Sequence, residues 1–115
     1  MSQSEADLDM VMLEGLKKLL ADKFDELITT FNSDCAARIG RIADALPDQN
    51  FTVICHEAHG VKGSCRNMGV NSLAELCDKM ESKARVQDGS DMEQLFAAIE
   101  QQFAAASNQL SSLLP

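Results

Sequence analysis

Both histidines of the chain fall in one short stretch, ICHEAHGVKGSCRNMG, which carries the side chains best suited to chemistry. A helix turns by about 100° per residue, so the ring of His59 points roughly 140° away from the apolar stripe that begins at Ile54. Lys62 and Gly63 follow His59 by three and four residues, which makes them its neighbours on a helical surface. A neutral imidazole carries a nucleophilic nitrogen at neutral pH. The spacing therefore predicts an exposed, nucleophilic histidine with a lysine beside it.

Gly63 is unusual in this position, because a glycine inside a helix costs about 1 kcal/mol relative to alanine. One interpretation is a tolerated helix defect. The interpretation we favour is that another macromolecule approaches His59 so closely that a side chain at Gly63 would obstruct it. Lys62 would then supply positive charge to an anion on the imidazole, and a phosphoryl group is the anion that matches best.

The elements that must position these residues are helices. Apolar residues recur at three- and four-residue spacing in four segments, roughly 24–46, 54–68, 73–84 and 92–113. Short connections near Pro47, Gly69 and Gly89 make successive helices antiparallel neighbours. We therefore expect an all-α fold, an up-down-up-down four-helix bundle, with a short additional helix between Leu8 and Leu20 lying across one end.

Two capping boxes are expected to begin the last two helices. Ser72 with Glu75, and Ser90 with Glu93, have the spacing at which a hydroxyl and a carboxylate satisfy the free amides of a first helical turn.

Composition limits the class of protein. The chain has 115 residues, 45% of them hydrophobic, and a formal net charge of -8. This length suits a single domain over 1–115, with a core from about 8 to 110. The acidity and the lack of Trp and Tyr argue against nucleic-acid binding. A polar, acidic start and the lack of a long apolar run predict a cytoplasmic protein that does not bind a membrane.

The positive charge is concentrated near the histidine in spite of this acidity. Between His59 and Arg85 the chain holds three acidic and five basic residues, the latter being Lys62, Arg66, Lys79, Lys83 and Arg85. The rest of the chain carries fifteen acidic and five basic residues. The histidine segment is thus suited to an anion, although the protein as a whole is not.

A metal site is a weaker alternative. Cys55, His56 and His59 could each donate to one ion, but a structural site needs four ligands and these three spread over a wide arc of helix. We interpret His56 as a surface residue. The remaining cysteines, Cys35, Cys65 and Cys77, fall in the apolar stripes and are expected to fill the core.

The string AHGVKGSCRNMG, followed by LAELCDKMESKAR, resembles the histidine-containing phosphotransfer (Hpt) domain of bacterial phosphorelays, and the similarity extends from Leu8 to about Leu110. The resemblance implies a four-helix bundle in which His59 accepts a phosphoryl group from an aspartyl phosphate. It also implies that Lys62 steadies the phosphoryl oxygens and that Gly63 lets the partner approach. Glu81 matches the polar residue that hydrogen-bonds the other ring nitrogen.

Periodicity supports Glu81 independently, because it lies one turn after Cys77 on the flank of its helix. Arg85, a further turn along, and Arg66 are secondary candidates for the same site.

The resemblance implies receiver domains as partners, belonging to a hybrid sensor kinase, a response regulator or both. The chain lacks a Gly-rich nucleotide loop, so we expect a phosphohistidine carrier without kinase activity of its own. No cofactor is expected on this chain, since the divalent metal would be on the receiver, and we expect a monomer. The alternative function is a non-catalytic helical adaptor that docks receivers without carrying phosphate.

Overall fold

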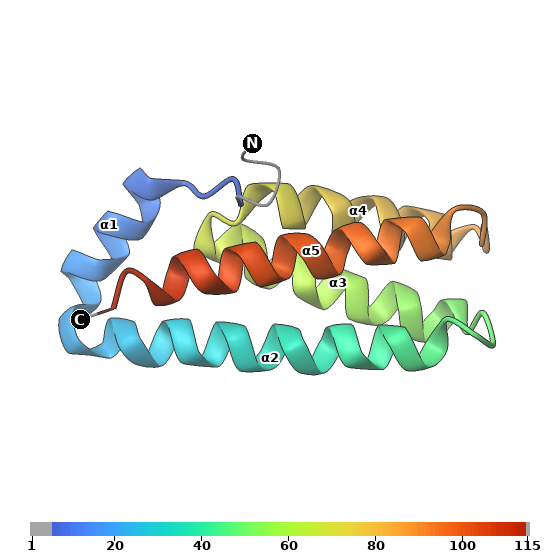
Figure 1. Ribbon diagram of the computed structural model, residues 1–115, viewed down its shortest axis with the longest axis horizontal. Coiled ribbons are helices and arrows are strands. Elements are labelled where there is room, and N and C mark those ends of the chain that lie inside the picture. Colours follow the sequence, from blue (N-terminus) through green and yellow to red (C-terminus); the bar gives the residue numbers. More distant parts are fainter. Residues whose placement is uncertain (1–5, 115) are drawn as a thin grey trace.

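The computed structural model describes residues 6–114, which form the helices shown in Figure 1. These helices are α1 (Met10–Leu20), α2 (Phe24–Ala45), α3 (Phe51–Met68), α4 (Asn71–Arg85) and α5 (Met92–Ser111). The four longer helices, α2 to α5, pack side by side, and each runs antiparallel to the one before it. The fold is all-α, as predicted.

The N-terminal helix α1 joins α2 directly. A single 3-10 turn, Ala21–Lys23, connects the two helices without an intervening loop. The carboxylate of Asp9 accepts a hydrogen bond from the backbone N–H of Met12 at 3.0 Å and so caps the start of α1. In Figure 1, α1 is steeply inclined to the long helices at the end of the bundle where α2 begins.

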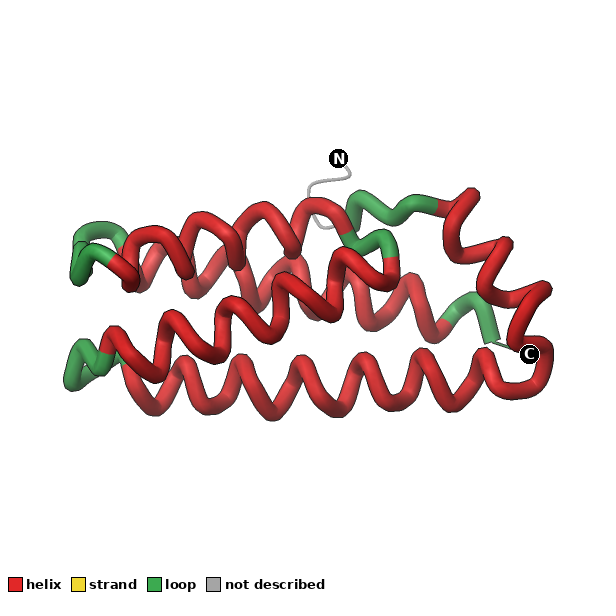
Figure 2. The backbone as a smooth tube through the Cα atoms, turned by 180° about the vertical axis from the view of Figure 1, so that it is seen from behind, coloured by secondary structure: helices red, strands yellow, loops and turns green. Residues whose placement is uncertain are grey.

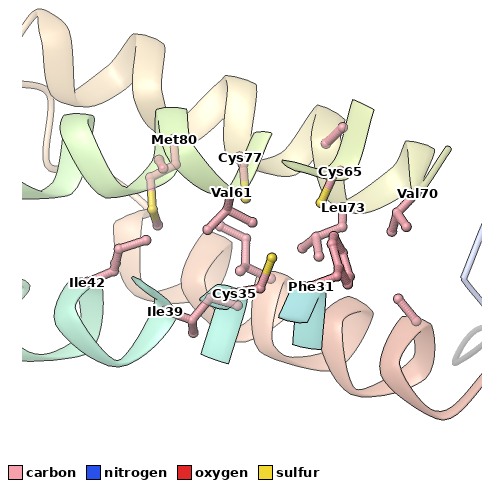
Figure 3. Close-up of a cluster of buried hydrophobic side chains, with 14 of the residues drawn as sticks. Phe31, Cys35, Ile39, Ile42, Val61, Cys65, Val70, Leu73, Cys77 and Met80 are labelled. Atoms are coloured by element: carbon pink, nitrogen blue, oxygen red, sulfur yellow. The ribbon is translucent and has the colours of Figure 1, made fainter. Parts of the chain in front are cut away.

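The predicted apolar stripes form the core. Figure 3 shows part of it, with side chains from α2, α3 and α4 directed toward one another. All members of the α3 stripe are buried, namely Ile54, Ala58, Val61, Cys65 and Met68. Because this stripe must face the core, the opposite side of α3, which carries His59, faces outward.

Two of the predicted helix ends are confirmed. The first long segment, α2, ends at Ala45, two residues before Pro47. Gly69 follows the last residue of α3 with φ of 70°, the left-handed conformation that favours glycine after a helix.

The predicted capping box at Ser72 is wrong, because α4 begins at Asn71 and Ser72 lies within its first turn. The start of α4 is held by the N-terminal segment. The N–H of Asn71 donates to the carbonyl of Asp7 at 2.8 Å, and Leu8 forms an isolated antiparallel bridge with Val70. A backbone partner from a distant part of the chain therefore does what the serine was expected to do.

The predicted capping box at Ser90 is also wrong. The hydroxyl of Ser90 donates to the carboxylate of Asp88 at 2.6 Å, and so does its backbone N–H at 3.0 Å. The serine therefore belongs to the α4–α5 turn, and α5 begins two residues later, at Met92. Figure 2 shows this turn at the same end of the bundle as the α2–α3 connection.

Helix α3 lies between α2 and α4, and its contact with α4 is the most extensive in the bundle. Residues on its two flanks can therefore reach side chains from either neighbour. Within residues 6–114, none of the helices is both long enough and apolar enough to cross a membrane.

Candidate functional site

His59 lies in the middle of α3 and projects from the surface of the bundle. Its side chain is 68% exposed. Asn50 begins this helix by accepting a hydrogen bond from the N–H of Val53, and the buried stripe fixes the rotation of the helix about its axis. The predicted exposure of His59 is therefore a consequence of helix packing.

Glu81 on α4 lies against His59 from the side. His59 Nδ1 and Glu81 Oε2 are 3.0 Å apart, and Glu81 is only 3% exposed. An ionised carboxylate can only accept hydrogen bonds, so Nδ1 must be the protonated ring nitrogen. This leaves the lone pair of the imidazole on Nε2, the nitrogen that does not contact Glu81.

Two cations share the Glu81 carboxylate with His59. Lys62 Nζ is 2.6 Å from Oε1, and Arg85 Nη2 is 2.6 Å from Oε2. Burial alone would raise the pKa of Glu81, but hydrogen bonds from Lys62 and His59 outweigh it and hold that pKa below its usual range. The carboxylate is thus kept ionised beside the ring.

Lys62 differs from the prediction in one respect. The spacing placed it on the helical surface beside His59, but its side chain is only 16% exposed because it lies between two carboxylates of α4. Its second partner is Asp78, whose Oδ1 is 3.1 Å from Nζ. Hydrogen bonds first to Glu81 and then to Asp78 raise the pKa of Lys62, so the ammonium stays charged.

Asp78 was not predicted from the sequence, although a signal was present. Asp78 precedes Glu81 by three residues, which places both carboxylates on the same face of α4.

Gly63 lies on the exposed face of α3, one turn after His59. A Cβ built on Gly63 would have no atom within 4 Å, apart from its own helix and its chain neighbours. The described part of the chain therefore contains no group that requires a glycine here.

The two arginine candidates behave differently. Arg85 reaches Glu81 and is 61% exposed. Arg66 is exposed on α3, and its side chain makes no hydrogen bond or ion pair with residues 6–114. The structure thus brings His59, Lys62, Glu81 and Arg85 together and leaves Arg66 apart.

A second buried carboxylate, Glu57, lies on the other flank of α3 and was also missed. Glu57 Oε1 accepts from Arg38 Nη1 and Oε2 accepts from Arg41 Nε, both at 2.9 Å. Gly60 makes room for this contact, because a Cβ there would clash with the guanidinium of Arg38. The signal available in the sequence was a glutamate only three residues from the core residue Ile54, on the core side of α3.

The cysteines are arranged as predicted. Cys35, Cys65 and Cys77 are fully buried between α2, α3 and α4, as Figure 3 shows, whereas Cys55 is partly exposed. A hydrogen bond with Cys35, together with burial, raises the pKa of Cys65, and burial raises the pKa of Cys77 to about 12. Across residues 6–114, no three His, Cys, Asp or Glu side chains are grouped so that they could hold a metal ion.

The chain is similar to known proteins in both sequence and fold. Residues 26–109 match the family model described as Hpt domain. No curated protein sequence matches the chain. The crystal structure of histidine-containing phosphotransfer protein B (HptB) from Pseudomonas aeruginosa PAO1 is similar, with 28% sequence identity, a TM-score of 0.88 and coverage of 92% of each chain.

The family match spans well over half of the chain, and a solved phosphotransfer protein shares its fold over nearly all of its length. Hpt domains interact with receiver domains in phosphorelays. The chain therefore belongs to the Hpt domain family and is a histidine phosphotransfer protein of a phosphorelay, a phosphoryl carrier and not a kinase.

Proposed function

We propose that His59 is the phosphoacceptor: its Nε2 accepts the phosphoryl group from the aspartyl phosphate of one receiver domain and passes it to the aspartate of another. The observation that carries this proposal is the 3.0 Å contact between His59 Nδ1 and Glu81 Oε2. It leaves the nucleophilic lone pair on Nε2 of a ring that is 68% exposed. The side chain of His56 is exposed too, but it has no such contact within residues 6–114.

The transfer step follows from this tautomer. The Nε2 lone pair attacks phosphorus in line with the bond to the aspartate oxygen, so the P–N bond forms as the P–O bond breaks and the aspartate leaves as a carboxylate. Because Nδ1 keeps its proton, the ring becomes positively charged. Glu81, already ionised and 3.0 Å away, stabilises that charge without rearrangement. Transfer to the second receiver reverses the same bonds.

Lys62 is proposed to offset negative charge on the equatorial phosphoryl oxygens. Its ammonium lies 2.6 Å from Glu81, the residue that contacts the ring, so a change of side-chain torsions can bring it to a group on His59. Arg85 provides a second cation on the same carboxylate, and Arg66 is a further cation on α3. Gly63 leaves open surface on α3, one turn from His59, where a receiver can approach closely.

The wider assignment rests on the family. We propose a single Hpt domain over 1–115, active as a monomer in the cytoplasm without a cofactor of its own. Its partners would be receiver domains of a hybrid sensor kinase, a response regulator or both.

The decisive experiment is incubation with a phosphorylated receiver, followed by analysis of the label on this chain. We expect acid-labile, base-stable label that disappears in His59→Gln. His56→Gln is the matched control, since it removes the other exposed histidine of α3, and it should take up label normally.

Label in His59→Gln, or its loss in His56→Gln, would contradict the site assignment. A wild-type chain that binds the receiver but takes no label would instead be a non-catalytic adaptor.

A further inference from the structure

Lys62 lies between two carboxylates of α4, and only one of them contacts the histidine. Nζ is 2.6 Å from Glu81 Oε1 and 3.1 Å from Asp78 Oδ1. The ammonium donates a hydrogen bond to Asp78 and forms an ion pair with Glu81. Lys62 is therefore already engaged in the unphosphorylated protein.

Asp78 is placed differently from Glu81. The side chain of Asp78 is 51% exposed, while that of Glu81 is 4% exposed. Asp78 makes no hydrogen bond to His59, and Lys62 is its ion-pair partner. Stabilising the positively charged ring requires only Glu81, so the transfer chemistry leaves the charge of Asp78 unexplained.

A phosphoryl group on His59 would compete with Asp78 for the same ammonium. If Lys62 turns to the phosphoryl group, its pair with Asp78 is broken, so the free energy of this pair favours the unphosphorylated state. The negative charge of Asp78 also repels a phosphoryl dianion nearby. Both effects lower the stability of the phosphohistidine relative to the free imidazole.

We propose that Asp78 is a positioning residue that holds Lys62 in the unphosphorylated protein and releases it when His59 carries a phosphoryl group. This inference rests on the proposed function of His59. As a consequence, Asp78 lowers the equilibrium fraction of phosphorylated His59. This favours transfer of the phosphoryl group from His59 to the next receiver.

The test is the equilibrium between a phosphorylated receiver and this chain, measured as the ratio of phosphorylated to free His59. A partly exposed ion pair changes such an equilibrium modestly, so Asp78→Asn should raise this ratio by about two- to five-fold. Asp78→Glu, which retains a carboxylate, should remain close to wild type.

Asp88→Asn is a matched control. Asp88 forms an ion pair with Lys83 at the same distance of 3.1 Å, and it is 46% exposed. This variant removes the same charge near the end of α4 but leaves Lys62 untouched, so it reports the long-range effect of net charge alone. We expect it to change the ratio much less than Asp78→Asn.

Coupling to Lys62 is tested in a double variant. In a Lys62→Gln background, Asp78→Asn should change the ratio less than it does in the wild-type background, because only the direct repulsion of the phosphoryl group remains. Equal effects of Asp78→Asn and Asp88→Asn in the wild-type background, or an undiminished effect without Lys62, would overturn the proposal. A wild-type chain that took no label on His59 would overturn the proposed function itself, which is a distinguishable result.

Discussion

Two buried carboxylates lie on opposite sides of α3, the helix that carries His59, and they have different partners. Glu57 faces α2 and is bound by two guanidinium groups, from Arg38 and Arg41. Glu81 lies on α4 and contacts an exposed imidazole as well as two cations. The two glutamates are similarly inaccessible, at 7% and 3% exposure.

The difference shows how α3 can be held in place on one side and carry a reactive residue on the other. The partners of Glu57 stay charged at every relevant pH and belong to one neighbouring helix, so the cluster joins α2 to α3. The partners of Glu81 include the ring that is proposed to change its charge during transfer. Burial of an acidic residue thus identifies both sites, but only the presence of an imidazole among the partners separates the reactive one from the structural one.

The largest expected effect is on stability, at Glu57. Glu57→Ala should lower the free energy of unfolding by about 2–3 kcal/mol, since it removes the ion pairs to Arg38 and Arg41 that join α3 to α2 and leaves Arg38 with Asp34 of its own helix. Glu81→Ala should cost roughly half as much, because Lys62 keeps Asp78 and Arg85 is exposed. Urea denaturation of both variants measures the two values. A larger loss for Glu81→Ala would reverse the comparison.

The next effect is on phosphoryl transfer, at Glu81. Glu81→Ala should slow transfer to His59 by about ten- to a hundred-fold, because a hydrogen bond to a charged group contributes about 1.5–3 kcal/mol. Glu57→Ala, assayed below its unfolding transition, should remain within about two-fold of wild type if it acts through stability alone. Single-turnover transfer from a phosphorylated receiver distinguishes the variants, and equal slowing would show that both carboxylates serve the reaction.

Low pH should weaken the ion pairs of both Glu57 and Glu81. Hydrogen bonds from Arg41 and Arg38 lower the pKa of Glu57 below its ordinary value of 4.5, and Glu81 is lowered too. A lowered pKa stabilises the fold above the unfolded value, and this stability is lost as the pH falls through the folded pKa. The free energy of unfolding should therefore decrease as the pH falls below about 4.5, with a smaller decrease in Glu57→Gln. The same decrease in that variant would exclude Glu57 as a cause.

The smallest effects are expected at the two glycines of α3. Gly63→Ala should raise the free energy of unfolding by about 1 kcal/mol, because alanine favours the helix and the Cβ meets open space. Gly60→Ala should gain little or nothing, since its Cβ would displace the guanidinium of Arg38. In an Arg38→Ala background, Gly60→Ala should regain the full benefit. Thermal denaturation of the four variants tests this, and equal gains at both glycines in the wild-type background would refute the contact.

Much of the fold could be predicted from the sequence, because it depends on regular spacing. The stripe from Ile54 to Met68 follows helical periodicity, and burying it determines where His59 points. The helix starts at Ser72 and Ser90 were mispredicted for a physical reason. A cap is a local motif that competes with other partners. Here the backbone of Asp7 accepts from the first amide of α4, and the carboxylate of Asp88 binds Ser90 itself.

The site could be predicted only in part. Periodicity and family resemblance both indicated Glu81, and the structure places it against His59. The engagement of Lys62 with Asp78 depends on which rotamer a long side chain adopts between two helices, and spacing alone does not determine that. The contact of Arg38 with Gly60 joins residues of different helices that are 22 positions apart, so neither residue indicates the other.

The unequal burial of the four thiols has a practical consequence for studying receiver binding. Cys55 lies one helical turn before His59 and is partly exposed, while the other three cysteines are enclosed in the core. A thiol-reactive fluorophore should therefore attach selectively at Cys55 in the folded protein, without any engineered cysteine. The native chain thus offers a reporter position beside the histidine, from which the arrival and departure of a receiver can be followed in real time.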